Sequence, residues 1–133
     1  MKLRFGAHRI TLVVCPMDMR CGFKRLDSIC GQLLGIDLTQ SQDLVVFVSK
    51  TRAIAKIVFC DSKGSNLLTR RLHSGHYQRL LMSADSKAVK PLSVSELERY
   101  LDGLPVEVMR NSVLKKKKTN INLILIKYYS IIF

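Results

Sequence analysis

The chain has 133 residues, 47% of them hydrophobic and 24% charged, which is an ordinary balance for a soluble globular domain. This length suits one domain with a single hydrophobic core and is short for two domains with separate cores. Lysine and arginine number 22 against 10 aspartate and glutamate residues, so the formal net charge is +12. Because each cation placed on a phosphate releases counterions, this charge favours a polyanionic partner over a protein that is merely basic and soluble.

The first predicted element is a β-strand over residues 8–15, where the sequence HRITLVVC is β-branched and apolar. Pro16 ends that strand. Apolar residues then recur at three- and four-residue steps, the spacing of one buried helix face, which predicts a helix over residues 18–34. Asp18 is predicted to be its N-cap, because a carboxylate there accepts from the free amides of the first turn, and Gly35 is predicted to end it.

Three or four strands are predicted to follow this helix as an antiparallel meander. Asp61 and Gly64 fit the first and last positions of a tight turn between two of them. Ser74 and Gly75 mark a second turn farther along the chain. The predicted strands cover residues 43–49, 53–60, 65–72 and 76–81.

Residues 83–90 are polar and are predicted to form a loop before a second helix. Ser93 or Ser95 can cap this helix, since residues 93–96 have the form of a capping box, and Gly103 ends it. The expected fold class is therefore α+β. We expect an antiparallel sheet of about four to five strands, with one long helix in the N-terminal half and one shorter helix in the C-terminal half.

We expect a single α+β domain over residues 1–110 and a separate lysine-rich tail over residues 111–133. Nearly all tail residues from Lys115 onward can be encoded by A and T alone. We therefore hypothesise that the original protein ends near Leu114 and that translation continues into AT-rich DNA after a frameshift. A membrane anchor is the alternative, but the apolar part, of roughly a dozen residues, is too short to span a bilayer.

The positive charge of the body is concentrated in its middle third. Residues 50–90 carry nine lysine and arginine residues against Asp61 and Asp85, a net charge of +7. Residues 1–49 sum to +2 and residues 91–110 to −2. We therefore expect the middle third to bind phosphates.

The four cysteines lie at irregular spacings with no Cys-x-x-Cys pair, so neither a zinc site nor another cofactor is predicted. Cys15, Cys30 and Cys60 fall within apolar strand or helix patterns, which predicts buried free thiols. Arg9 and Asp18 interrupt any early apolar stretch, so we expect no secretory signal and a reducing, cytoplasmic location.

Several sequence blocks resemble one known family. Residues 18–26 read DMRCGFKRL and are similar to the Asp-Met-Arg-x-Gly-Phe-x-x-Leu signature of the accessory proteins encoded by the second reading frame of insertion-sequence-66-type transposons. Residues 46–77 contain blocks similar to the family's Val-Phe, Lys-Ile-Leu-x-x-Asp-x-x-Gly, Lys-Arg-Leu and Gly-x-Phe blocks, in the same order. Residues 92–104 resemble its closing Leu-Ser and Leu-x-Gly pattern. These are TnpB-type transposition proteins, distinct from the far larger RNA-guided nuclease of that name.

This resemblance implies a role in DNA transposition beside a separate transposase that carries the metal-dependent catalytic carboxylates. The implied partners are DNA at the element ends and the transposase. The chain departs from the family by lacking Trp or Tyr in the strand that ends at Cys60 and near Leu68, and by a thinner arginine cluster, which favours weaker DNA contacts or a decayed element. The family-motif residues are Asp18, Arg20, Gly22, Phe23, Asp61 and Gly64.

The candidate nucleic-acid-binding residues flank the ends of adjacent predicted strands, so they could gather on one edge or face of the sheet. We expect them to position the protein on phosphates rather than to read bases. The alternative is a solvated strand surface, where lysine also discourages edge-to-edge pairing. The resemblance implies that His76 replaces a basic residue that faces phosphate. The set is Lys50, Arg52, Lys56, Arg70, Arg71 and His76.

Catalytic and metal-binding alternatives have little support in the sequence, and we expect no enzyme. Asp18 and Asp61 could form a carboxylate pair for phosphoryl transfer, but each fits a structural role and no third acidic residue matches. His73 and His76 could form half of a zinc site, but they span a turn. Arg20 fits a structural salt bridge and a partner contact equally well. No glycine-rich phosphate loop or nucleophile elbow occurs.

Three functions remain open from the sequence. The first is a DNA-binding accessory factor that uses the basic surface of residues 50–79. The second is a protein-interaction module that holds the transposase and touches DNA little, which an exposed apolar patch would favour. The third is a degenerate, inactive copy.

Overall fold

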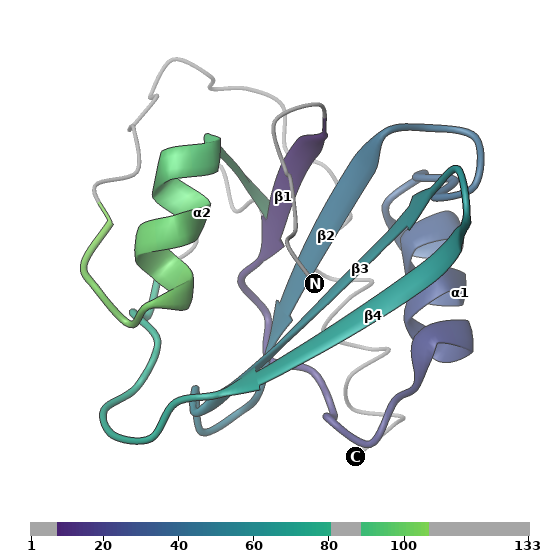
Figure 1. Cartoon of the computed structure of the whole chain (residues 1–133). Helices are drawn as coiled ribbons and strands as arrows, with labels where there is room; N and C mark the ends of the chain where they lie inside the picture. Colours follow the sequence, from purple (N-terminus) through teal and green to yellow (C-terminus); the bar gives the residue numbers. More distant parts are fainter. Residues whose placement is uncertain (1–7, 81–88, 107–133) are drawn as a thin grey trace, which may run out of the picture.

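The computed structural model describes residues 8–80 and 89–106, which form one five-stranded sheet between two helices (Figure 1). The strand order across the sheet is β4-β3-β2-β1-β5. Most neighbouring strands are antiparallel, so the expected α+β class is confirmed. The predicted tail at 111–133 lies outside the described residues. The elements are β1 (Arg9–Val13), α1 (Phe23–Leu33), β2 (Asp43–Val48), β3 (Ile54–Asp61), β4 (Gly64–Arg71), β5 (Val89–Leu92) and α2 (Val94–Leu101).

One pair of strands is parallel, and the prediction of a wholly antiparallel sheet is wrong there. β1 runs alongside β2 in the same direction, with Arg9 opposite Asp43 and Leu12 opposite Val46. Parallel neighbours need a crossover long enough to carry the chain back to the starting end. α1 is that crossover, because it lies between the two strands in the sequence and covers one face of the sheet.

The fifth strand comes from a different segment than expected. Residues 76–80 have no strand structure, whereas β5 lies at Val89–Leu92, at the end of the segment predicted to be a loop. β5 pairs antiparallel with β1, with Ile10 opposite Leu92. Pro91 is tolerated in β5 because an edge strand uses only one side of its backbone for pairing.

α1 begins later than predicted, and Asp18 is not its N-cap. The N-cap is Gly22, which supplies no side-chain hydrogen bond. The Asp18 carboxylate instead accepts from the amide and guanidinium of Arg20, at 2.6–3.0 Å, and so stabilises a turn before the helix. Short acidic side chains compete in this way with helix formation. Gly35 does follow the last helical turn, with a φ of +69° that favours glycine.

The start of α2 is confirmed at Ser93. The Ser93 hydroxyl accepts from the Glu96 amide at 3.1 Å, and the Glu96 carboxylate accepts from the Ser93 amide at 2.8 Å. This reciprocal pair is a capping box, which satisfies two backbone donors that the helix leaves free. Gly103, at φ +78°, follows the helix and reverses the chain.

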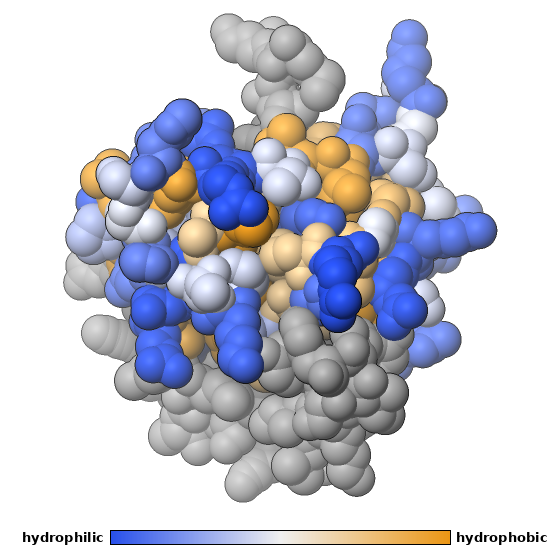
Figure 2. All heavy atoms as spheres, turned by 90° about the horizontal axis from the view of Figure 1, so that it is seen from below, coloured by the Kyte–Doolittle hydropathy of each residue, from blue (hydrophilic) through white to orange (hydrophobic). Residues whose placement is uncertain are grey.

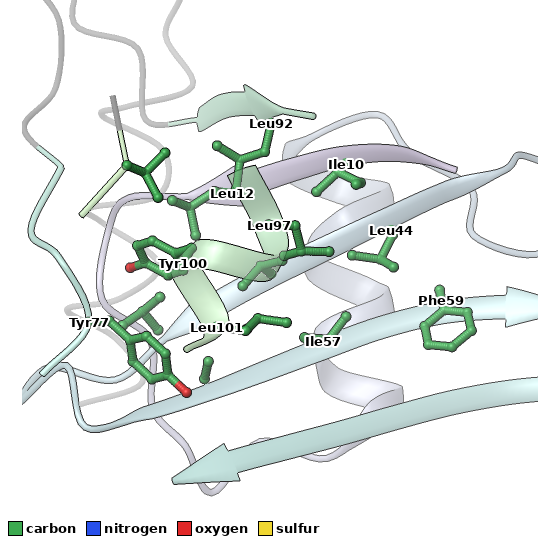
Figure 3. Close-up of a cluster of buried hydrophobic side chains, with 14 residues drawn as sticks. Ile10, Leu12, Leu44, Ile57, Phe59, Tyr77, Leu92, Leu97, Tyr100 and Leu101 are labelled. Carbon is green, nitrogen blue, oxygen red and sulfur yellow. The ribbon is translucent and has the colours of Figure 1, made fainter. Parts of the chain in front are cut away.

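Two apolar cores lie on opposite faces of the sheet. α1 packs its buried side chains on one face, and α2 covers the other together with Tyr77 (Figure 3). Every residue of β2 is buried, because both of its faces are covered. Partners therefore cannot reach the faces of the central strand β2, whereas most residues of β4 are exposed. The α1-side contacts join Leu26, Ile29 and Cys30 to Val45, Phe47 and Val58, and the α2-side contacts join Leu97, Tyr100 and Leu101 to Leu12, Leu44, Val46 and Ile57.

Candidate nucleic-acid interface

The turn between β2 and β3 presents two of the predicted cationic residues. Ser49 organises it: its amide donates to the Ile54 carbonyl at 2.9 Å, and its hydroxyl accepts from the Ala53 and Ile54 amides at 3.2 Å. Lys50 is exposed on the turn. Arg52 is half-buried and has a φ of +62°, a left-handed conformation uncommon for a residue with a side chain.

The segment after β4 runs across this end of the sheet and is held there at several points. The Leu72 amide donates to the Ala53 carbonyl at 3.0 Å, and the Tyr77 amide donates to the Arg52 carbonyl at 2.7 Å. Tyr77 is fully buried, and its hydroxyl donates to the Arg70 carbonyl at 3.2 Å. Its ring stacks on Tyr100 of α2 at a centroid distance of 5.3 Å (Figure 3). These contacts fix the flanking residues 76–79 beside the β2–β3 turn.

Cationic side chains therefore surround one end of the sheet, and we call this set the basic rim. Figure 2 views this end from below, where hydrophilic side chains project around a paler, more apolar centre. The ion pairs among the described residues are Arg9–Asp43, Arg20–Asp18 and Arg70–Asp102, and none involves the rim. Its charge is thus left for an external anion. The basic rim consists of Lys50, Arg52, Arg71, His76 and Arg79.

A cavity of about 380 Å³ opens within the basic rim. Its walls come from the ends of β1 and β2, from residues 78–80 and from Tyr100, and most of them are apolar. Lys50, Arg52 and Arg79 also line it. Arg79 was not among the predicted site residues, because nothing local in the sequence placed it beside the turn. Its only signal was the concentration of charge in the middle third.

Three predicted site residues are engaged by the protein itself, and one of them is Arg52 of the rim, whose guanidinium donates to the Tyr77 carbonyl at 3.5 Å. Neighbouring residues in a strand point to opposite faces, so Arg70 and Arg71 diverge. Arg70 lies on the α2 face and donates to the Leu101 carbonyl at 3.2 Å and to Asp102 at 3.3 Å. Lys56 lies on the α1 face and donates to the Cys21 carbonyl at 2.8 Å. The structure therefore does not gather all six predicted residues on one face.

The family-motif residues form two local structures at different places in the fold. Lys56 ties down the loop that carries Arg20 and Gly22, and Phe23 packs against the α1-side core. At the far end of β3, the Asp61 carboxylate accepts from the amides of Lys63 and Gly64 at 2.8 and 2.9 Å, which confirms the predicted turn. Asp18 and Asp61 thus each stabilise a turn, and Arg20 forms an ion pair with Asp18 while most of its side chain stays exposed.

The Asp18–Arg20 pair makes the stability of the chain sensitive to acid. Hydrogen bonding from the Arg20 guanidinium lowers the pKa of Asp18 below its ordinary value of 3.8. A carboxylate whose pKa is lower in the folded chain stabilises it above the unfolded-state pKa, and this stabilisation is lost as the pH falls through the folded value. We expect Asp18→Asn to lower the free energy of unfolding at neutral pH by more than it does near pH 2. Urea denaturation at both pH values measures this, and an equal loss at both would contradict it.

The alternative metal and thiol sites have no counterpart among residues 8–80 and 89–106. No group of three His, Cys, Asp or Glu side chains there could hold a metal ion. The cysteines are unpaired, and burial raises the pKa of the Cys30 thiol to about 12, so it stays protonated at neutral pH. Cys15 and Cys30 are buried as predicted, whereas Cys60 is only half-buried. In the same part of the chain, neither helix is long and apolar enough to cross a membrane.

Comparisons with known proteins agree with the motifs. A family model described as "IS66 Orf2 like protein" matches residues 8–111, and so covers every element of the fold. The "Uncharacterized protein y4hO" of Sinorhizobium fredii is 28% identical over 94 residues, which cover 71% of this chain and 81% of that relative. No solved structure matches the chain. The chain therefore belongs to the IS66 Orf2-like family, and so has a transposition-related accessory role.

Proposed function

We propose that this protein is an accessory factor in DNA transposition of an insertion sequence, and that it binds DNA phosphates through the basic rim without catalysis of its own. The observation that carries the proposal is the rim itself. Cations from the β2–β3 turn, the end of β4 and residues 76–79 lie at one end of the sheet, and none is in an ion pair with a described acidic residue.

Phosphate binding suits this surface better than base reading. Four of the five rim residues are lysine or arginine, and their long cationic side chains on turns and strand ends match a repeating backbone charge. Contacts of this kind set the position of a protein on a duplex and carry no sequence information directly. Asp18 and Asp61, the only acidic residues of the family motif, are occupied by hydrogen bonds within their own turns, which favours a role without catalysis.

Adjacent arginines of β4 provide a matched test. Arg71 belongs to the rim, whereas Arg70 is paired with Asp102 on the other face. We expect Arg71→Gln to weaken binding to duplex DNA by roughly fivefold at physiological salt and to reduce the slope of log K against log salt by about 0.9, which is the contribution of one phosphate contact. Arg70→Gln removes the same charge and is expected to leave the slope nearly unchanged. Fluorescence anisotropy on element-end DNA over a series of salt concentrations measures both.

The same titration separates this proposal from its rivals. A wild-type protein that does not bind naked DNA at low salt would overturn the proposal. Co-purification with the transposase in that case would favour the protein-interaction module. Failure to restore transposition to an element that lacks its own copy would favour a degenerate gene.

A further inference from the structure

The two outer strands of the sheet differ in how open they are to pairing. β5 is four residues long and contains Lys90 and Pro91, both of which discourage a further strand. β4 is eight residues long, contains no proline and keeps an unbroken register with β3 from Gly64 to Arg71. No described strand lies on its outer side (Figure 1). A long, regular edge without proline is a template for another strand.

The register with β3 fixes which backbone groups of β4 face outward. The Leu72 amide donates to the Ala53 carbonyl, so Leu72 is turned toward β3. In an antiparallel ladder this orientation alternates, and Arg70 and Leu68 are therefore also turned inward. The alternate residues, among them Leu67 and Thr69, present their N–H and C=O groups to the outside. The Leu67 side chain is also 38% exposed, so a paired strand would remove apolar surface from water.

We propose that the outer edge of β4 pairs with β4 of a second copy of this chain, antiparallel about a two-fold axis at Leu68. Continuity of the two faces selects the direction. Two outer edges can meet in parallel only if one sheet is turned over, which would set the α1 face of one copy beside the α2 face of the other. Antiparallel pairing about Leu68 places the two Arg71 residues about 20 Å apart, beyond the screening length at physiological salt.

Hydrogen bonding selects the register. Two-fold pairing keeps each face of the sheet continuous, so residues directly opposite must lie on the same face. An axis at Leu67 would leave Arg71 without a partner residue, because the position opposite it, Lys63, lies in the β3–β4 turn and not in β4. An axis at Leu68 sets Ser65 opposite Arg71 and Leu67 opposite Thr69, and each of these pairs exchanges both backbone hydrogen bonds. The strand is thus self-complementary in hydrogen bonding, and it sets the two Leu68 residues opposite each other.

Sedimentation equilibrium of the full chain without DNA tests the pairing. The chain has a mass of 15.1 kDa, and we expect the wild type to shift to twice that mass as its concentration rises. Thr69→Pro removes an outward N–H and leaves the ladder with β3 intact, so we expect it to raise the dimer Kd at least about tenfold. Ser95→Pro, at the exposed second residue of α2, is the matched control and is expected to keep the wild-type Kd.

Cysteine cross-linking tests the register. In the proposed pair, the two Leu68 residues are directly opposite, with Cα atoms about 4.5 Å apart, within disulfide range. We expect Leu68→Cys to give a reducible dimer under mild oxidation, and Leu67→Cys to give at least about tenfold less. A wild type that stays at 15.1 kDa at all concentrations, or a Thr69→Pro chain that dimerises equally well, would overturn the proposal. These measurements contain no DNA, so their outcome is independent of phosphate binding by the rim.

Discussion

Replacing Tyr77 with alanine is expected to lower the free energy of unfolding by about 3–5 kcal/mol, the usual cost of removing a buried aromatic side chain. Tyr77 is fully buried, stacks on Tyr100 and lies in the α2-side core. Its loss removes the stack and leaves a cavity between α2 and the strand ends. The backbone hydrogen bond from residue 77 to the Arg52 carbonyl remains in the variant, but the segment loses the side chain that anchors it beside the basic rim. Urea denaturation followed by circular dichroism measures the loss.

Two further variants show whether that loss has the stated cause. Tyr77→Phe keeps the ring and removes only the hydroxyl that donates to the Arg70 carbonyl, so we expect a loss of about 1 kcal/mol. Leu104→Ala removes a side chain that is 43% exposed and is expected to change stability by about 0.5 kcal/mol or less. A Tyr77→Ala chain within about 1 kcal/mol of the wild type would mean that this core does not depend on the tyrosine stack.

Removing three cations of the rim together is expected to reduce DNA affinity on the order of 100-fold at physiological salt. The variant combines Lys50→Ala, Arg71→Ala and Arg79→Ala, all at exposed positions. If each side chain contacts one phosphate, the slope of log K against log salt falls by about 2.7. Since none of the three takes part in a described ion pair, we expect little change in the free energy of unfolding.

The control for this variant removes the same amount of charge elsewhere. Lys63 lies at the β3–β4 turn, Lys90 in β5 and Arg99 on α2, and none of the three belongs to the basic rim. Changing these three to alanine is expected to reduce affinity only a few-fold through the net charge. Equal losses for the two triple variants would mean that overall charge, and not the rim, attracts DNA.

The parts of the fold that could be predicted are those with a local cause. The capping box at Ser93 and the Asp61–Gly64 turn are both closed by hydrogen bonds within a few residues, so the sequence contains all of their partners. The central strands were predictable for a related reason, since two covered faces produce continuous apolar runs such as Asp43–Val48.

The parts that could not be predicted depend on distant partners or on competition between two local structures. Asp18 has the residue type and position of a helix cap, yet Arg20 two residues later engages the same carboxylate. β5 has only four residues and a proline, and it is a strand only because β1 lies beside it. Part of the rim could be predicted, because the positive charge is concentrated in the middle third of the sequence. Arg70 was predicted wrongly to lie with Arg71, because alternate residues of a strand point to opposite faces. Arg79 was missed, because the burial of Tyr77 is what places residues 76–79 beside the β2–β3 turn.

The pairing of β1 with β5 has a consequence for the protein as it leaves the ribosome. One edge of β1 can pair with β2 once α1 and β2 have been synthesised. Its other edge stays unpaired until Val89–Leu92, near the end of the described chain, has been synthesised. Until then the nascent polypeptide exposes an apolar strand with free backbone groups, the kind of surface on which chains aggregate. Truncation before residue 89 should therefore yield insoluble chains, whereas loss of residues 111–133 should not, and the yield of soluble protein in cells distinguishes the two.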